Sequence, residues 1–156
     1  MAIGLLDTNI LIDFLAGVPQ ALTEVSQYSD VAISNITYME VVIGLRRDVG
    51  LGTITPAESA ATMAVIGSLD VIPIDQHITN TSIDIRANSI LGPGKKIKLP
   101  DAIIYATAQT QGRYMITRDP GGFTGPLVRI PYQIKRQDQN KAAQTDVIDY
   151  QLPPPV

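Results

Sequence analysis

The stretch Ile3–Leu6, followed by Asp7, Thr8 and Asn9, decides the fold because an apolar run stops abruptly at three polar side chains. A short, continuously apolar run predicts a strand that is buried on both faces of a sheet. Further short apolar runs are also expected to be strands, at residues 31–33, 71–74, 114–116 and 127–130. Segments with helical features separate these runs. This alternation predicts an α/β fold with a parallel sheet that helices cover on both faces.

Start and stop signals mark the helices between the predicted strands. Helices are expected at residues 10–15, 19–28, from 37, from 55, at 75–91 (the longest) and at 102–111. Thr37 with Glu40, and Thr55 with Glu58, fit capping boxes, in which both side chains bond backbone N–H groups. Pro73 places the third strand at a sheet edge, because proline cannot donate a hydrogen bond to a neighbouring strand.

The composition excludes several classes of protein. The chain has 156 residues, which suits one domain, and its lack of cysteine excludes disulfide frameworks, thiolate zinc sites and cysteine nucleophiles. Its only histidine, His77, excludes a multi-histidine zinc site and is expected on the surface of a helix. With two phenylalanines and no tryptophan, the core should be aliphatic. No run approaches the ~20 apolar residues of a membrane span and no signal peptide is evident, so a soluble, cytoplasmic protein is expected.

The charge balance limits how the protein can bind a substrate. Fifteen acidic and twelve basic residues give a net charge of −3, which argues against binding nucleic acid by bulk charge. If four of the acids held metal ions, eleven acids would face twelve bases and the remaining surface would be about neutral. The composition is therefore compatible with a metal-dependent nuclease that makes few, short contacts with its substrate.

The end of the chain differs in character from the rest. Residues 135–156 are polar and include three prolines at 153–155. Such a composition cannot bury enough apolar surface to fold alone, so it predicts a disordered C-terminal extension or tail. The folded domain is expected to span residues 1–134.

Four acidic residues are expected at the carboxyl ends of the strands. Asp7 ends the first strand, Glu40 is placed in the first turn of the helix after the second strand, Asp101 begins the helix before the fourth strand, and Asp119 follows that strand. Ligands of α/β sheets bind at this edge. Clustered carboxylates repel one another unless a cation neutralises them, and oxygen ligands suit Mg²⁺ or Mn²⁺. The pattern therefore fits metal-assisted phosphodiester hydrolysis.

Each of these residues also fits a purely structural role. Asp7 and Asn9 can cap the first helix, and Glu40 fits a capping box. Asp101 lies where a helix dipole favours negative charge, and Asp119 can begin a turn before Pro-Gly-Gly. The coincidence of all four acids at one edge favours the metal site over four separate structural roles.

Four segments together resemble the motifs of PIN-domain nucleases, and are most similar to bacterial VapC-type toxins. They are Asp7-Thr8-Asn9, the run SNITYME at 34–40 with Gly44, the run PDAIIYATA at 100–108, and Ile116-Thr117-Arg118-Asp119. The resemblance covers about residues 1–131. It implies a parallel sheet in the order 3-2-1-4-5 and Mg²⁺ or Mn²⁺ as cofactor. It also implies RNA cleavage to 3′-hydroxyl and 5′-phosphate ends, homodimers, and a small DNA-binding antitoxin of the VapB type as partner.

Carried over by position, the resemblance assigns roles to single residues. It implies that Asp7, Glu40, Asp101 and Asp119 are the catalytic, metal-binding acids. Thr117 resembles the family's hydroxyl residue, which orients the fourth acid or a water, and Thr8 and Asn9 would shape the turn of the first motif. Gly122 stands where the family often has an acid before phenylalanine, so that second acid is missing.

Basic residues and short polar side chains near this edge are candidates for substrate binding. The candidate set is Thr8, Asn9, Arg46, Lys95, Lys96, Lys98 and Arg118. Lysine and arginine contact nucleic-acid phosphates, but at a helix end or in a loop they can equally be solvated. Arg118 has a third option, which is to pair with an acid at the same edge.

Three functions compete on this evidence. The first is a metal-dependent endoribonuclease of the toxin kind, which depends on the four acids. The second is a non-catalytic PIN-like module for RNA binding or assembly, against which the intact set of acids argues. The third is a phosphatase of the haloacid-dehalogenase type with Asp7 as nucleophile. That type usually carries an acid two residues later, where this chain has Asn9.

Overall fold

Five parallel strands form the central sheet of the computed structural model, which describes residues 2–119, 121, 123–135 and 146–149. The strands are β1 (Ile3–Leu6), β2 (Asp30–Ser34), β3 (Asp70–Ile72), β4 (Tyr114–Ile116) and β5 (Val128–Arg129). Their order is β3-β2-β1-β4-β5, and every neighbouring pair is parallel. The α/β class and the strand order are confirmed, and β3 is an edge strand as Pro73 predicts.

Strand pairing separates the core into two layers. Leu5 of β1 lies beside Ala32 of β2 and Met115 of β4, and all three belong to one cluster of buried residues. The next residue along each strand faces the other side of the sheet, because side chains alternate along a strand. Those residues belong to the second buried cluster. Both faces of the sheet are therefore covered, as continuous apolar strands predict.

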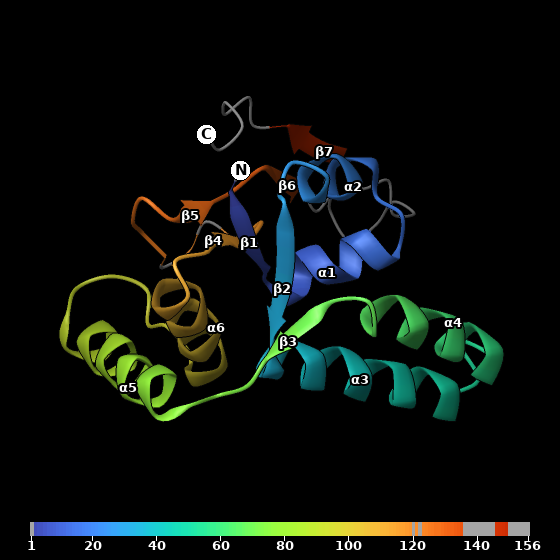
Figure 1. The fold of residues 1–156 in the computed structure, drawn as a ribbon, viewed down its shortest axis with the longest axis horizontal. Coiled ribbons are helices and arrows are strands. Elements are labelled where there is room, and N and C mark those ends of the chain that lie inside the picture. The colour runs from blue at the N-terminus through green and yellow to red at the C-terminus, as the bar shows by residue number, and fades with distance from the viewer. Residues whose placement is uncertain (1, 120, 122, 136–145, 150–156) are drawn as a thin grey trace.

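Helices supply the outer layers on both faces. Among the described residues they are α1 (Thr8–Leu15), α2 (Pro19–Val25), α3 (Asn35–Gly50), α4 (Pro56–Ile66), α5 (Gln76–Leu91) and α6 (Leu99–Thr110). One core cluster takes its helical residues from α5, α6 and the first turn of α3, where Ile36 packs against it, and the other takes them from α1 to α4. Figure 1 shows the same division, with α5 and α6 on one side of the sheet and α1 to α4 on the other.

Helix α3 begins earlier than the sequence pattern predicts. Ser34 is its N-cap, and the Ser34 side chain accepts a hydrogen bond from the backbone N–H of Ile36 at 3.3 Å. The predicted capping box of Thr37 and Glu40 is therefore wrong, and Glu40 lies in the second turn rather than the first. The matching box of Thr55 with Glu58 is present at the start of α4. Helix α5 is not uniquely the longest, since α3 and α5 both have 16 residues.

Tyrosines complete a core that the composition predicts to be aliphatic. Tyr28, Tyr105 and Tyr132 are buried, and Tyr132 is fully so. The ring of Tyr28 lies against Gly4 in β1, where an added Cβ would come within 3.1 Å of it. The aliphatic prediction is therefore incomplete, because three aromatic rings fill space between the sheet and its helices.

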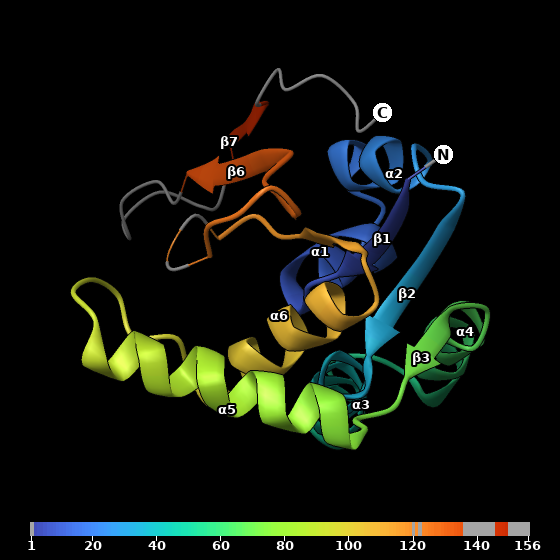
Figure 2. The ribbon, with the colours of Figure 1, turned by 60° about the vertical axis from the view of Figure 1, so that its left-hand side comes forward.

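A second, two-stranded sheet follows the main fold. Strand β6 (Tyr132–Lys135) pairs antiparallel with β7 (Asp146–Asp149), and Figure 2 shows this hairpin apart from the five-stranded sheet. The prediction of a disordered tail is wrong for residues 146–149, because β6 supplies hydrogen-bonding partners that the tail lacks alone. The remainder of the tail, 136–145 and 150–156, lies outside the described residues. The domain boundary at residue 134 stays a prediction.

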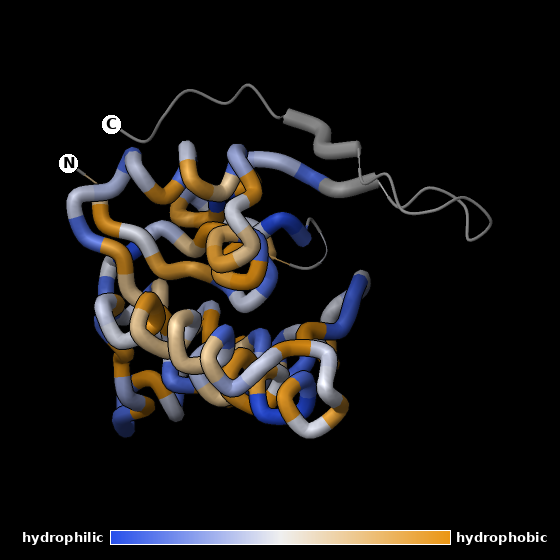
Figure 3. The backbone as a smooth tube through the Cα atoms, turned by 90° about the vertical axis from the view of Figure 1, so that its right-hand side faces the viewer, coloured by the Kyte–Doolittle hydropathy of each residue, from blue (hydrophilic) through white to orange (hydrophobic). Residues whose placement is uncertain are grey.

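Hydropathy follows the layered architecture. In Figure 3 hydrophobic segments gather in the body of the molecule and many of the hydrophilic ones lie at its edges. Within the described part of the chain, every helix is too short or too polar to cross a membrane.

Candidate metal centre

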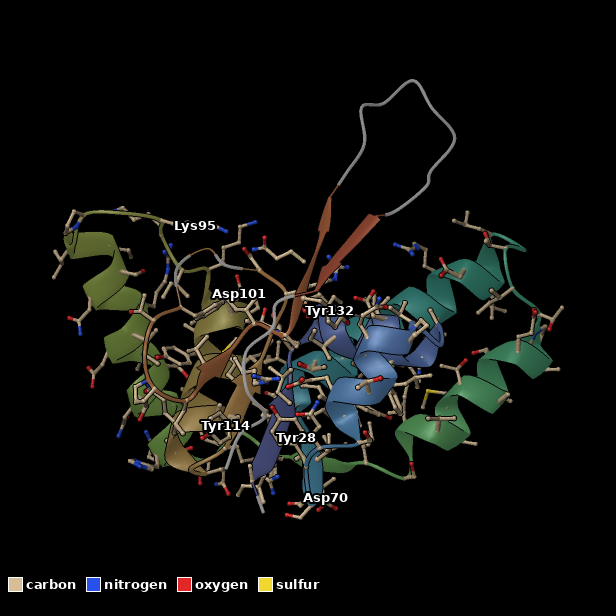
Figure 4. The ribbon with its side chains drawn as sticks, turned by 90° about the horizontal axis from the view of Figure 1, so that it is seen from above. Tyr28, Asp70, Lys95, Asp101, Tyr114 and Tyr132 are labelled. Carbon is tan, nitrogen blue, oxygen red and sulfur yellow. The ribbon has the colours of Figure 1, made fainter. Side chains whose placement is uncertain are left out.

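The four predicted acids come from four different elements at the carboxyl edge of the sheet. Asp7 directly follows β1, Glu40 lies on α3, Asp101 is in the first turn of α6, and Asp119 follows β4. Asp7 is buried, Asp101 and Asp119 are half-buried, and Glu40 is exposed. In Figure 4 Lys95 and Asp101 lie toward one end of the strands, opposite Asp70, the first residue of β3. The acids therefore combine one buried carboxylate with three that solvent reaches.

Thr117 connects the first and last of these acids. Its side chain is fully buried, and its hydroxyl donates a hydrogen bond to Oδ2 of Asp7 at 2.7 Å. The hydroxyl oxygen of Thr117 in turn accepts a hydrogen bond from the backbone N–H of Asp119 at 3.1 Å. Thr117 thus holds the carboxylate of the first acid and the backbone of the fourth, so it is a positioning residue in this structure.

Asn9 ties the start of α1 to the segment after β4. Its amide Nδ2 donates to Oδ2 of Asp7 at 3.1 Å and to the Thr117 hydroxyl at 3.3 Å. Its Oδ1 accepts from the backbone N–H of Arg118 at 3.2 Å. All its side-chain polar atoms are therefore engaged within the protein. These hydrogen bonds are those of a residue that shapes the first-motif turn, and a role of Asn9 in substrate binding stays a prediction.

Thr8 links α1 to α3. Its hydroxyl donates a short hydrogen bond to Oε2 of Glu40 and lies 3.4 Å from the hydroxyl of Thr37, which is fully buried. Asp7 also caps α1, because its Oδ1 accepts from the backbone N–H of Thr8 at 2.8 Å. The structural role weighed for Asp7 is thus real, and it leaves the rest of that carboxylate facing the other acids.

The carboxylates of the four acids interact by electrostatic repulsion. Burial is the main cause that raises the pKa of Asp7, hydrogen bonds from Thr117 and Thr8 oppose it, and the charges of Asp101 and Glu40 raise it further. The pKa of Asp101 is also raised, first by burial and then by Glu40 and Asp119. Acids that disfavour each other's charge in this way form a site that a cation would stabilise.

The donor chemistry of this edge fits a hard divalent cation. All four side chains offer carboxylate oxygens, the ligand type that Mg²⁺ and Mn²⁺ prefer, and the chain has no cysteine and one histidine. Within the described ranges, however, no three such side chains are already arranged to hold an ion. Glu40 and Asp119 are exposed or half-exposed, so modest side-chain movements would be needed to gather the ligands.

The three lysines of the α5–α6 loop have three different environments. Lys95 pairs with Asp119, with 3.2 Å between its Nζ and Oδ2. Lys96 donates from Nζ to the carbonyls of Ile90 at 3.1 Å and Gly92 at 2.7 Å, so it caps the end of α5 instead of facing a substrate. Lys98 is the exposed N-cap residue of α6, and its charge lowers the pKa of Asp101.

Arg118, Arg46 and His77 differ in their contacts and exposure. Arg118 donates from Nε to Oδ2 of Asp13 at 2.8 Å, which settles its options in favour of an acid that the sequence analysis did not single out. Arg46 is exposed on α3 and makes no hydrogen bond or ion pair with the described residues. His77 is exposed in the first turn of α5, as predicted.

Two residues that support the site, Asp13 and Thr37, could not be predicted from the sequence, because the residues that they contact are distant in the chain. Asp13 also accepts a hydrogen bond from the hydroxyl of Tyr132 at 3.0 Å, across 119 positions. Thr37 was assigned only to a helix cap, although it is buried against Thr8. An acid on the otherwise apolar face of α1 was the one available signal, since a buried carboxylate needs a partner.

Comparison with known proteins supports the same architecture. Similar solved structures include a toxin–antitoxin complex from Klebsiella pneumoniae, at 35% identity and a TM-score of 0.70, covering 84% of this chain and 99% of that one. A DNA-bound VapBC from Salmonella typhimurium has 25% identity and a TM-score of 0.62, covering 76% and 87%. The sarcin–ricin-loop-cleaving toxin VapC20 of Mycobacterium tuberculosis has 17% identity and a TM-score of 0.56, covering 81% and 92%, a likeness of fold alone.

Sequence comparison identifies the family. No curated protein matches the chain significantly. A family model of the PIN domain matches residues 4–124, which include all four acids, Thr117, β2 to β4 and all of β1 except its first residue. The chain belongs to the PIN domain family.

Proposed function

We propose that this protein is a metal-dependent endoribonuclease that hydrolyses phosphodiester bonds of RNA and leaves 3′-hydroxyl and 5′-phosphate ends. The observation that carries the proposal is the buried carboxylate of Asp7, which Thr117 and Asn9 orient and which lies close enough to Glu40 and Asp101 to be repelled by their charges. Burying an acid among other acids is unfavourable unless a cation is bound. PIN membership supplies the fold in which these acids meet.

The residues divide into ligands and supports. Asp7, Glu40, Asp101 and Asp119 would hold Mg²⁺ or Mn²⁺. When bound, such an ion supplies Lewis acidity that activates water and offsets charge on the phosphate. Thr117 keeps one oxygen of Asp7 oriented, and Thr8 does the same for Glu40. These hydrogen bonds preserve the carboxylate directions when no cation is present.

Substrate and partner follow from the surroundings of the site. Lys98 and Arg46 are exposed, and the charge of Lys98 acts on Asp101. Both side chains are available for RNA phosphates, which suits few and short contacts. We also propose a toxin that acts in the cytoplasm as a homodimer, with a small DNA-binding antitoxin of the VapB type as its partner. The likeness to a toxin–antitoxin complex and to a DNA-bound VapBC supports the pairing with an antitoxin.

The direct test compares RNA cleavage by purified wild type with D7N and D101N. With Mg²⁺ present, the wild type should produce new 5′-phosphate ends and both variants should produce none, because each loses a carboxylate ligand. D48N is the matched control, since Asp48 pairs with Arg47 on α3 and is not one of the four acids. Circular dichroism should show the same fold in all four proteins. Cleavage retained in both D7N and D101N would refute the proposal.

A non-catalytic RNA-binding or assembly module is the alternative. Its support is that the described residues hold no preassembled group of three metal ligands. Induction of wild type and D7N in a bacterial host separates the two functions. Growth arrest with discrete RNA cuts from the wild type alone supports the nuclease. Equal, harmless expression without new RNA ends supports the module.

A further inference from the structure

We propose that Lys95 is an internal counter-ion of the acid site, whose ammonium group holds Asp119 until a divalent cation displaces it. The inference rests on the proposed function, because it assumes that Asp119 is a metal ligand. It adds a residue that competes with the metal from within the same chain. Lys95 would thereby set how much divalent cation the site requires.

The contact between Lys95 and Asp119 is direct and accessible. Nζ of Lys95 lies 3.2 Å from Oδ2 and 3.5 Å from Oδ1 of Asp119, so the ammonium faces both oxygens that a metal would use. The side chains are 59% and 47% exposed. A pair with this exposure is weak and open to exchange with ions from solvent.

A glycine makes room for the lysine. An added Cβ at Gly121 would lie 2.7 Å from Cδ of Lys95 and would also collide with its Nζ. The backbone N–H of Gly121 donates to Oδ1 of Asp119 at 2.9 Å. The lysine stem therefore crosses the turn that presents Asp119, in space that any other residue at 121 would occupy.

The ammonium also acts on a second acid of the site. The charge of Lys95 lowers the pKa of Asp101, as that of Lys98 does. Lys95 thus lies where its charge acts on two of the four carboxylates. A divalent cation on Asp119 would repel this ammonium at short range, so the two cannot share the position. Because metal binding must break the ion pair between Lys95 and Asp119, this pair weakens the affinity of the site for metal.

Mn²⁺ binding measures this competition without any cleavage assay. Free Mn²⁺ is followed by electron paramagnetic resonance during titration of full-length wild type, K95Q and K98Q. K98Q is the matched control, because it removes the same charge from the same loop and from the field at Asp101, but not the contact with Asp119. The dissociation constant of K95Q should fall roughly two- to fivefold, the range expected for a half-exposed pair, and that of K98Q clearly less.

A second variant changes the contact and keeps every charge. G121A places a methyl group against the Lys95 side chain and 3.1 Å from Oδ1 of Asp119. Because the flexible lysine stem is the closer of the two, it should be displaced first, and Mn²⁺ binding should tighten in the same direction as in K95Q. Equal effects of K95Q and K98Q, or unchanged binding in both K95Q and G121A while the wild type binds Mn²⁺, would overturn the inference and leave the nuclease proposal standing. Absence of Mn²⁺ binding in every variant would overturn both. Binding by K95Q where the wild type shows none would support the inference.

Discussion

At the scale of single residues, several contacts hold the buried carboxylate of Asp7 at once. It caps α1, accepts from Thr117 and Asn9, and faces the charges of Asp101 and Glu40. Hydrogen bonds orient it, but burial makes its charged form unfavourable. Burial of the Asp7 carboxylate therefore lowers the stability of the folded protein, while its hydrogen bonds fix the direction in which it can act as a ligand. This combination is common at functional sites.

The unfavourable burial of the charged Asp7 side chain predicts how the stability of the protein depends on pH. The pKa of Asp7 is raised in the folded state, so the folded protein binds this proton more tightly than the unfolded chain. The contribution of Asp7 to the free energy of unfolding is then fully present below its unfolded pKa, near 4, and is lost as the pH rises through the folded pKa. Urea unfolding with a chelator should show the wild type losing stability relative to D7N as the pH rises above about 4.

The sign of that difference is the critical result. A wild type that gains stability over D7N across this range would show that hydrogen bonds to Asp7 outweigh its burial. Asp101, whose pKa is also raised, remains in both proteins and largely cancels in the comparison.

Single residues were predictable where local sequence carries the signal. Asp7 and Asp119, which follow strands, and Asp101, which begins a helix, lie at the edge of the sheet where the sequence places them, and their role as metal ligands stays a prediction. The partners of Arg118 and Lys96 were not predictable, because nothing near Arg118 in the sequence indicates Asp13, 105 positions away. Capping of α5 by Lys96 depends on how the loop after Gly92 folds back, which its composition does not determine.

At the scale of elements, a buried ion pair joins α2 to β5. Glu24 accepts from Nη2 of Arg129 at 2.9 Å, and also from the hydroxyl of Tyr28 at 2.7 Å. Both members of the ion pair are buried. Helix α2 and β5, which are distant in the sequence, thus depend on one charged contact in the core.

Breaking this pair should be costly. E24Q leaves the buried guanidinium of Arg129 facing a neutral amide, so the free energy of unfolding should fall by about 3 to 5 kcal/mol. D48N breaks the exposed pair with Arg47 and should cost less than about 1 kcal/mol. Denaturant unfolding of both variants beside the wild type measures the difference. Similar losses in the two variants would contradict the assignment of Glu24 to the core.

Elements were predictable wherever hydrophobic periodicity is strong. All five strands of the main sheet and all six helices that cover it have a counterpart in the sequence prediction, and most errors are of one or two residues at an end. The start of α3 was misplaced because Ser34 and Thr37 are both good caps, and packing of Thr37 against Thr8 decides between them. Strand β7 was missed because its segment is short and polar and forms a strand only with β6. The alternation of Tyr132 and Ile134 with polar residues was the usable signal for that hairpin.

At the scale of the whole molecule, Tyr132 connects the hairpin to the main domain. Its ring is fully buried in the core cluster that also contains Leu6 and Ile116. Its hydroxyl donates to Asp13, which also holds Arg118. The first residue of β6 is therefore part of the main core, consistent with a domain that extends past the matched residues 4–124.

Two substitutions at Tyr132 should separate its contributions. Y132A removes a fully buried ring and should lower the free energy of unfolding by about 3 to 5 kcal/mol. Y132F removes one hydrogen bond to Asp13, which keeps Arg118, and should cost about 1 kcal/mol. Thermal and urea unfolding of the full chain give both values. A small loss in Y132A would mean that the hairpin packs loosely and contributes little to the core.

The strand order also has a consequence for how the protein is made. β1 emerges first from the ribosome, but Thr117, which orients Asp7, is translated 110 residues later, and Tyr132 later still. During most of synthesis the nascent chain has β1 with one open edge and an unassembled set of acids. For the nuclease proposed above, this timing keeps a growing chain inert beside the ribosomal and messenger RNA that it would otherwise meet first.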